Sequence, residues 1–385
     1  MPSRTQSGSP YMQFAKLRSE AKYNLASSGI MSYPLKDLPV TLEGLEICGP
    51  TLYGYAPLVE QLARLNGVTP DCVVTAAGTS MANHLALAAT LEPGDEALVE
   101  WPTYELIIST LAYLGVTVRY FDRRMEDGFR VDPEEVERRM TPQTRLIVLT
   151  NLHNPTGTLI DEATLRAVGD LAKKNNARVL VDEVYQEALY EQRPRPAVHL
   201  GDHFLVTSSL TKAYGLSGLR CGWVLANPEL TQRMWHINDL YGVNAAFPAD
   251  LLSVIALDNL ERVAARARKL LEANRPVLDA FLRSRQDIEY FRPEFGTVVF
   301  PKVLHGTVDQ LDRLLREEYE TSVVPGKYFG MPEHFRVGIG GDPDMTRAGL
   351  ERLGLALDKM RGRGGFAPSE LFIPVREISE KTDLR

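Results

Sequence analysis

The sequence predicts an α/β protein with a mainly parallel, seven-stranded sheet covered by helices on both faces, followed by a smaller α+β domain. Between residues 70 and 226, short apolar runs alternate with longer amphipathic stretches. After Phe247 this alternation stops, and a long charged stretch leads into shorter apolar runs. Polar motifs directly follow several of the first runs, and ligands of parallel sheets bind at the carboxyl ends of the strands.

The expected strands of the sheet are the apolar runs at residues 72–76, 96–100, 116–121, 145–150, 178–182, 204–208 and 221–226. Helices are expected between them, at residues 80–91, after Pro102, from Asp132 and over 161–175. Asp132 precedes a proline and two glutamates, which is typical of an N-cap with proline at the first helical position. Strands separated by helices run parallel, because each connection crosses back over the sheet.

The chain beyond Phe247 predicts a second, smaller domain. It contains one long charged helix with possible breaks over residues 248–285, strands at 297–300, 322–325 and 335–339, and helices at 308–319 and 344–360. We expect an N-terminal arm that is part of the small domain (1–45), a large domain (46–247), the small domain (248–362) and a tail (363–385). The arginine–glycine cluster at the start of the tail favours a solvated linker over RNA contact in this acidic chain.

The composition is that of an ordinary globular protein, with 44% hydrophobic and 24% charged residues. A net charge of −7 argues against a general affinity for nucleic acid or for an anionic membrane. No apolar run approaches transmembrane length and the first ten residues lack an apolar signal, so we expect a cytoplasmic protein. Cys48, Cys72 and Cys221 lack metal-ligand spacing, so we expect reduced thiols and no metal.

One lysine in a turn of small and hydroxyl-bearing residues is the most informative feature of the chain. Lys212 follows Ser209 by three positions and precedes Arg220 by eight. A lysine in such surroundings can lose its proton and attack a carbonyl, and a nearby arginine can neutralise a phosphate. This pattern is what an enzyme needs to hold pyridoxal phosphate (PLP) as a Schiff base.

Two further polar motifs follow strands upstream of this lysine. An Asn-Pro-Thr-Gly turn at residues 154–157 follows the strand at 145–150, and Asp-Glu-Val-Tyr at 182–185 follows the strand at 178–182. Each motif alone has a structural explanation, as a turn, an N-cap or a core tyrosine. The ends of neighbouring parallel strands meet at one edge of a sheet, so the two motifs and Lys212 are expected to converge on one crevice.

On these motifs the chain resembles the fold-type I PLP enzymes and, within them, the class I and II aminotransferases. The resemblance rests on residues 154–157, 182–185 and 209–212 with Arg220, and on Phe-Arg-Val-Gly at 335–338, all in the order and spacing of the family. It implies the PLP-dependent transferase fold of type I. It also implies a homodimeric aminotransferase of amino acid metabolism that moves an amino group from an L-amino acid to a 2-oxo acid.

The resemblance implies the catalytic roles of three residues. Lys212 forms an aldimine with PLP, and then moves a proton between the substrate Cα and the cofactor on the way to a pyridoxamine intermediate. Asp182 pairs with the pyridine nitrogen and keeps it protonated. Tyr185, with Asn154, donates a hydrogen bond to the phenolic oxygen of the ring and stabilises its anion.

The remaining implied contacts hold the phosphate, the ring and the substrate. Tyr104 is implied to stack on the pyridine ring. Arg336 is implied to bind the substrate α-carboxylate bidentately, near Asn154 and the backbone of Gly29. The phosphate is implied to lie at a helix start, among backbone N–H groups, hydroxyls and one guanidinium, contributed by Gly78, Thr79, Ser80, Ser209 and Arg220.

The chain departs from the family pattern in four places. The arm lacks the Gly-x-Pro-Asp of many relatives, and Gly49 stands where a tyrosine normally reaches the phosphate of the neighbouring subunit; Tyr53 and Tyr55 are candidates to replace it. His153 replaces a common asparagine, and a polar loop residue is the favoured interpretation. Residues 241–247 lack the second arginine of dicarboxylate-specific members, which argues against aspartate or glutamate as the sole preferred donor.

Three other functions were weighed against transamination. A PLP-dependent lyase, or a cyclising or oxidising biosynthetic enzyme, would use the same cofactor site and stays open as the alternative. A non-catalytic PLP domain of a transcription regulator is disfavoured, because the first 70 residues show no basic helix-turn-helix pattern. A dinucleotide-dependent dehydrogenase is disfavoured, because Gly-Thr-Ser-Met at 78–81 stands where Gly-x-Gly-x-x-Gly is required.

Overall fold

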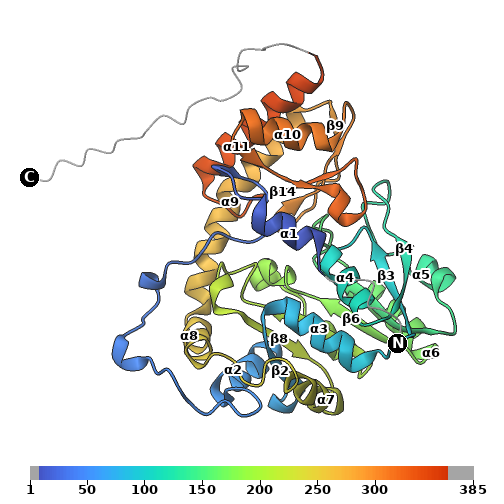
Figure 1. Ribbon diagram of the computed structural model, residues 1–385, viewed down its shortest axis with the longest axis vertical. Coiled ribbons are helices and arrows are strands. Elements are labelled where there is room, and N and C mark those ends of the chain that lie inside the picture. The colour runs from blue at the N-terminus through green and yellow to red at the C-terminus, as the bar shows by residue number, and fades with distance from the viewer. Residues whose placement is uncertain (1–7, 363–385) are drawn as a thin grey trace, which may run out of the picture.

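The computed structural model describes residues 8–362, and the expected tail at 363–385 lies outside them. A seven-stranded sheet forms the centre of the larger part, in the order β2-β8-β7-β6-β5-β3-β4 (Figure 1). Only β8 runs antiparallel to its neighbours. Every expected strand of this sheet is found, with bounds within one residue of the prediction: β2 (Val73–Ala77), β3 (Glu96–Trp101), β4 (Thr117–Asp122), β5 (Thr144–Thr150), β6 (Arg178–Asp182), β7 (Phe204–Ser209) and β8 (Cys221–Leu225).

Helices cover both faces of this sheet. One face packs on α2 (Ala56–Asn66), α5 (Pro133–Arg139), α6 (Glu162–Lys174) and α8 (Phe247–Asp258), and the other on α3 (Gly78–Thr90), α4 (Glu105–Tyr113) and α7 (Pro228–Asn238). In β6, Val179 and Val181 belong to the first core and Leu180 to the second. Successive side chains of a strand point to opposite faces, so a strand buried on both faces has to be apolar throughout.

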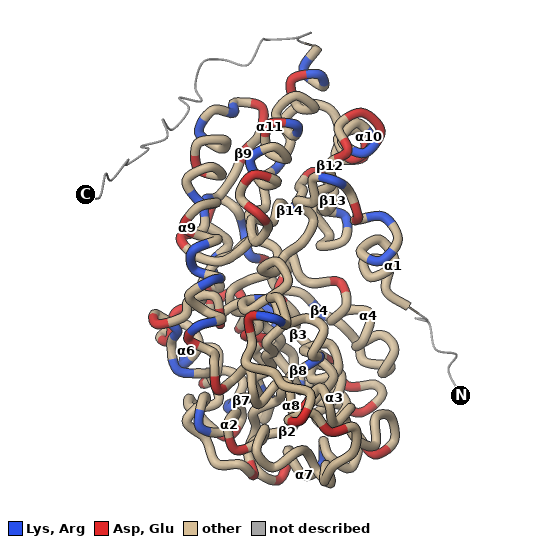
Figure 2. Tube along the Cα trace, turned by 90° about the vertical axis from the view of Figure 1, so that its left-hand side faces the viewer, with Lys and Arg blue, Asp and Glu red and all other residues tan. Residues whose placement is uncertain are grey.

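A smaller part with its own apolar core lies beside the sheet. Its helices are α9 (Leu260–Ser284), α10 (Val308–Glu318) and α11 (Pro343–Met360), along which Figure 2 shows charges of both signs. Its strands are short: β9 (Ile288–Glu289), β10 (Val298–Val299), β11 (Lys302–Val303), β12 (Thr321–Ser322), β13 (Val324–Pro325) and β14 (Phe335–Gly338). The arm contributes β1 (Tyr23–Asn24), which pairs with β12. The exact domain boundaries stay a prediction.

The long helix expected over residues 248–285 is two helices. They are separated at Asn259, whose side chain donates a hydrogen bond to the Ile255 carbonyl at 2.8 Å and so satisfies the end of α8. Asparagine competes for backbone hydrogen bonds and therefore favours helix ends over helix interiors. The break lets α8 pack on the sheet while α9 continues into the core of the smaller part.

The N-terminal arm contains a helix that the sequence did not predict. Helix α1 (Pro10–Leu17) begins at the N-cap Ser9, whose hydroxyl accepts from the backbone N–H of Met12 at 3.1 Å. It lies between the larger and the smaller part (Figures 1 and 2). Within residues 8–362, no helix is both long enough and apolar enough to cross a membrane.

Candidate active site

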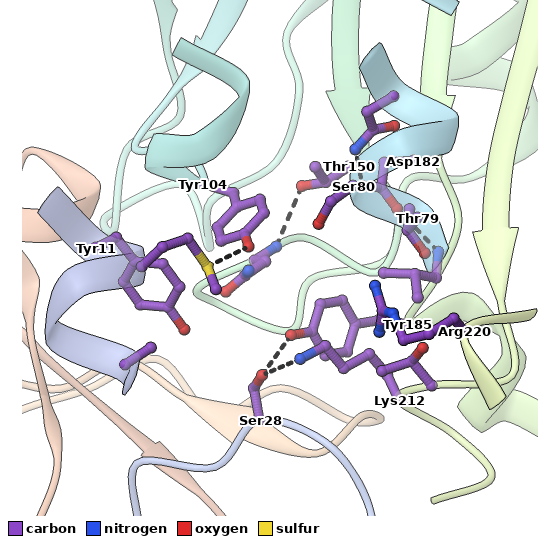
Figure 3. A pocket seen from close by; sticks show the side chains of 16 residues that line it. Tyr11, Ser28, Thr79, Ser80, Tyr104, Thr150, Asp182, Tyr185, Lys212 and Arg220 are labelled. Carbon is purple, nitrogen blue, oxygen red and sulfur yellow. Dashed lines mark hydrogen bonds between the residues drawn. The ribbon is translucent and has the colours of Figure 1, made fainter. Parts of the chain in front are cut away.

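A cavity of about 210 Å³ lies at the carboxyl ends of β5, β6 and β7. This is the edge where the connections of a parallel sheet bring distant polar segments together. Eight of the residues expected in the site line the cavity (Figure 3): Thr79, Ser80, Tyr104, Asn154, Asp182, Tyr185, Lys212 and Arg220. The other four expected residues lie directly behind this lining: Gly29, Gly78, Ser209 and Arg336.

The lysine of the turn after β7 points into the cavity (Figure 3). Its Nζ donates a hydrogen bond to the Ser28 hydroxyl at 3.2 Å, and the same hydroxyl accepts from Tyr185 at 2.7 Å. Lys212 forms no ion pair with any carboxylate in the described part of the chain. The arm crosses close over this turn, because a Cβ at Gly29 would lie 3.2 Å from the Lys212 Cα. The amine is therefore held in place without a counter-ion.

Asp182 is a buried carboxylate at the end of β6, with 4% of its surface exposed. It accepts hydrogen bonds from the Asn83 side chain at 2.8 Å and from the Val184 backbone at 3.1 Å. Asn83 is oriented in turn by the Thr207 hydroxyl, which donates to it at 2.6 Å. Burial raises the pKa of Asp182 to about 6, although these hydrogen bonds and the charge of Lys212 act in the opposite direction. No cation pairs with Asp182 within residues 8–362, so the site favours a proton or a positively charged ligand.

A buried ion pair between Glu100 and Arg123 holds the turn after β5. Glu100 accepts from both the backbone N–H and the hydroxyl of Thr150 at 2.6 Å, and pairs with Arg123 at 2.6 Å. The Thr150 hydroxyl in turn accepts from the Asn154 backbone at 3.2 Å. The Asn154 side chain accepts a hydrogen bond from Arg336 at 2.9 Å. This chain of bonds fixes the position of Asn154 at the cavity wall.

The start of α3 forms an open anion cradle. Its N-cap, Ala77, makes no side-chain capping bond; the Gly78 N–H donates to the Arg220 carbonyl at 2.8 Å, and the N–H groups after it have no capping side chain. Gly78 has φ +75°, and a Cβ at this position would overlap the guanidinium of Arg220. The Thr79 hydroxyl donates to Ser209 at 2.8 Å. Helix N-termini with free N–H groups and a neighbouring arginine bind phosphate.

Arg336 on β14 is a buried cation, with 1% of its surface exposed. Its Nη1 donates to Asn154, and its Nη2 donates to the Tyr11 hydroxyl and to the Ala26 carbonyl, each at 3.1 Å. Its Nε has no partner, and no carboxylate of the described residues pairs with it. A buried charge without a counter-ion is costly, so this guanidinium is suited to bind an anionic ligand.

Tyr104 is the N-cap residue of α4, and its ring lines the cavity. It packs edge-on against Tyr11, with ring centroids 5.4 Å apart, and its hydroxyl contacts the Met12 sulfur at 3.6 Å. Burial raises its pKa well above the ordinary value of tyrosine, so Tyr104 stays neutral and presents an aromatic surface.

Some cavity residues were not expected from the sequence. Tyr11, Ser28, Asn83 and Thr150 also line the cavity. Asn83 lies one helical turn after Ser80 and therefore on the same face of the helix, a spacing that could have indicated it as a site residue. The arm, which contributes Tyr11 and Ser28, carries no such periodic signal. His153 lies in a loop, as expected, and is buried there: its ring contacts Thr156 at 2.7 Å and the Pro102 carbonyl at 2.9 Å, and burial lowers its pKa well below the usual value.

Comparisons with known proteins agree with this geometry. The family described as aminotransferase class I and II matches residues 47–353. The chain is 28% identical to capreomycidine synthase of Streptomyces vinaceus, over 90% of this chain and 93% of that protein. It is also 28% identical to aspartate/prephenate aminotransferase of Thermus thermophilus, over 78% and 80%. A solved PLP-dependent aminotransferase of Streptococcus suis superposes with a TM-score of 0.85 at 26% identity, covering 91% and 96%.

These findings confirm the expected fold, the PLP-dependent transferase fold of type I. They do not favour the lyase or the cyclising or oxidising enzyme that the sequence left open. Since the family match spans most of the chain, the protein belongs to the aminotransferase class I and II family and is a PLP-dependent transaminase.

Proposed function

We propose that the cavity holds PLP on Lys212 and that the enzyme moves an amino group between an L-amino acid and a 2-oxo acid. The residues present fit this cofactor in three ways. A lysine without a counter-ion faces the cavity, a buried carboxylate without a cation stands at the end of β6, and α3 begins uncapped beside Arg220. When bound, PLP supplies an electron sink for the cleavage of a substrate Cα–H bond. The unpaired, buried Asp182 is the observation that carries the proposal most directly.

Lys212 would hold the cofactor through Nζ. Once free, its amine is the base that would take the proton from the substrate Cα. The Ser28 hydroxyl lies between Lys212 and Tyr185, at 3.2 and 2.7 Å, and so positions the free amine. Tyr185 and Asn154 would donate to the ring oxygen, for which the Tyr185 hydroxyl would turn away from Ser28.

Asp182 would accept a hydrogen bond from the protonated nitrogen of the ring. Asn83 and Val184 already donate to its two oxygens, so the carboxylate is oriented before the ligand arrives. A positive group beside Asp182 lowers the pKa that burial has raised, and the carboxylate then stays ionised at neutral pH. Tyr104 covers one face of the ring.

Two groups of residues hold the cofactor phosphate and the substrate α-carboxylate. The start of α3 and Arg220 bind the phosphate, with Gly78, Thr79, Ser80 and Ser209 forming the cradle. Arg336 binds the substrate α-carboxylate, beside Asn154 and the backbone of Gly29. These contacts orient the Cα–H bond toward Lys212.

We also propose that the enzyme is a cytoplasmic homodimer. Leu42, Ile47 and Leu52 are 86%, 83% and 85% exposed, in the segment that leads from the arm to α2. A cluster of exposed apolar side chains is typical of a protein interface. Gly49 in this segment cannot be a tyrosine, because the Phe247 ring fills the space of its side chain. Tyr53 and Tyr55 do not line this chain's own cavity, which leaves them available to the partner copy.

Amino transfer is tested with the purified protein, PLP, twenty single L-amino acids and 2-oxoglutarate or pyruvate as acceptor. We expect at least one donor to yield the matching 2-oxo acid and, in equal amount, glutamate or alanine. Release of ammonia or of a cyclised product, with no new amino acid, would instead establish the alternative reaction class.

A further inference from the structure

The unexpected helix α1 carries Tyr11 to the edge of the Arg336 guanidinium, with its hydroxyl directed into the cavity (Figure 3). Glu105 fixes the start of this helix from the sheet side, through the Ser9 hydroxyl and the Tyr11 backbone N–H. On the other side the Tyr11 ring packs against Phe329, with centroids 5.8 Å apart. Contacts from both parts of the protein therefore hold Tyr11 in a defined position.

The hydrogen bond between these two residues leaves one donor unused. Arg336 Nη2 donates to the Tyr11 hydroxyl oxygen at 3.1 Å, so the oxygen acts as the acceptor. Among the described residues, nothing accepts the hydroxyl proton of Tyr11. The Nε of Arg336 is also without a partner. Two buried donors, one at the cavity wall and one directly behind it, thus lack an acceptor, and a carboxylate has two oxygens to offer.

The charges around Tyr11 also favour an anion at this point. Burial opposes the ionisation of its hydroxyl, but the positive charges of Arg336 and Lys212 lower its pKa below the ordinary value of tyrosine. Arg336 also lies over the Tyr11 ring, with Cζ 5.8 Å from the centroid. An electropositive environment of this kind strengthens the hydroxyl as a donor to a carboxylate.

We propose that Tyr11 is a substrate-binding residue, which donates its hydroxyl proton to the α-carboxylate that Arg336 binds. This inference rests on the proposed role of Arg336. It makes α1 part of the substrate site, so that one wall of the site comes from the N-terminal arm. The hydroxyl acts on every amino acid and 2-oxo acid alike, because all of them carry the α-carboxylate.

Tyr11→Phe tests this inference, because it keeps the ring and its packing and removes only the hydroxyl. Tyr328→Phe is a matched control: its ring packs 6.0 Å from the Tyr11 ring in the same aromatic cluster. Three quantities are measured on the PLP-loaded enzymes: KM and kcat for the best amino donor, and the inhibition constant of butanoate, which carries a carboxylate but no amine. The loss of a hydrogen bond to a charged group weakens ligand binding by about tenfold or more.

We expect Tyr11→Phe to raise both KM and the butanoate inhibition constant about tenfold, with kcat changed less than about twofold and Tyr328→Phe like the wild type. Unchanged KM and inhibition constants in Tyr11→Phe, with both raised in Arg336→Ala, would overturn the inference and leave the proposed function intact. If Arg336→Ala also changes neither constant, the carboxylate site itself is misassigned. A loss of kcat alone in Tyr11→Phe would assign the residue to the chemistry instead and likewise overturn the inference.

Discussion

Gly78→Ala is expected to weaken PLP binding without a matching loss of stability. Gly78 lies in the left-handed region, with φ +75°, and its added Cβ would come within 2.7 Å of Arg220 Cζ. The overlapping atoms belong to the end of a flexible side chain, so the guanidinium can move away at little cost to folding. The Arg220 guanidinium then leaves the position in which we propose that it binds the phosphate.

The magnitude follows from the contact that is lost. A hydrogen bond to a charged group contributes about 1.5–3 kcal/mol, so the dissociation constant of PLP should rise by a factor of about 10 to 150. The left-handed backbone adds roughly 1 kcal/mol of instability when alanine replaces glycine. Gly94→Ala separates the two effects, since Gly94 has φ +99° and open space around its Cβ.

The assay is a titration of the PLP-free variants with PLP, followed by absorbance, together with thermal unfolding of the same samples. Both variants should show a similar drop in unfolding temperature, and only Gly78→Ala should bind PLP more weakly. Equal PLP affinity in the two variants would refute the role given to Arg220 and to the start of α3.

The remaining predictions concern Asp182 and Arg220. Asp182→Asn should retain PLP but lower turnover by orders of magnitude in steady-state assays, because a neutral amide cannot keep the ring nitrogen protonated; near-normal turnover would make Asp182 a structural residue. In the PLP-free protein, the native pKa of Asp182 is raised from 3.8 to about 6, so the native state binds the proton more tightly than the unfolded state does. The wild type should therefore lose stability relative to Asp182→Asn as the pH rises from about 4 to about 6 in denaturant titrations; parallel pH profiles would contradict the raised pKa. Arg220→Lys keeps the charge but loses the forked donors, one of which binds the Ala77 carbonyl at 3.0 Å. Its PLP affinity should fall about tenfold, and an unchanged affinity would mean that charge alone suffices.

The sheet and the residues at its edge could be predicted because they depend on local sequence. Strands such as β6 are apolar on both faces and can be recognised in the sequence. The end of each strand then fixes the position of the motif that follows it. The positions of Asp182 and Lys212 at this edge therefore follow from the pattern of apolar runs, whereas their roles were implied by the resemblance to the family. The break at Asn259 was left open, because no proline or glycine marks it in the sequence.

The contribution of the N-terminal arm could not be predicted, because tertiary contacts and not local propensity determine it. Helix α1 has eight residues, too few to be stable alone, and depends on contacts with Glu105 and with the aromatic cluster of the smaller part. Ser28 lies in irregular backbone 184 positions from the lysine that it contacts. His153 occupies a loop in the sequence but is buried, because Thr156 and Pro102 satisfy both of its ring nitrogens.

The attachment of the cofactor to Lys212 is the central claim, and chemical trapping tests it most directly. The protein is loaded with PLP, reduced with sodium borohydride, digested and mapped by peptide mass spectrometry, with Lys212→Ala treated in parallel. We predict reduced PLP on the peptide that contains Lys212 and no stable label in the variant, which should also lack transaminase activity. Label on another lysine, or amino transfer that survives in Lys212→Ala, would contradict the account.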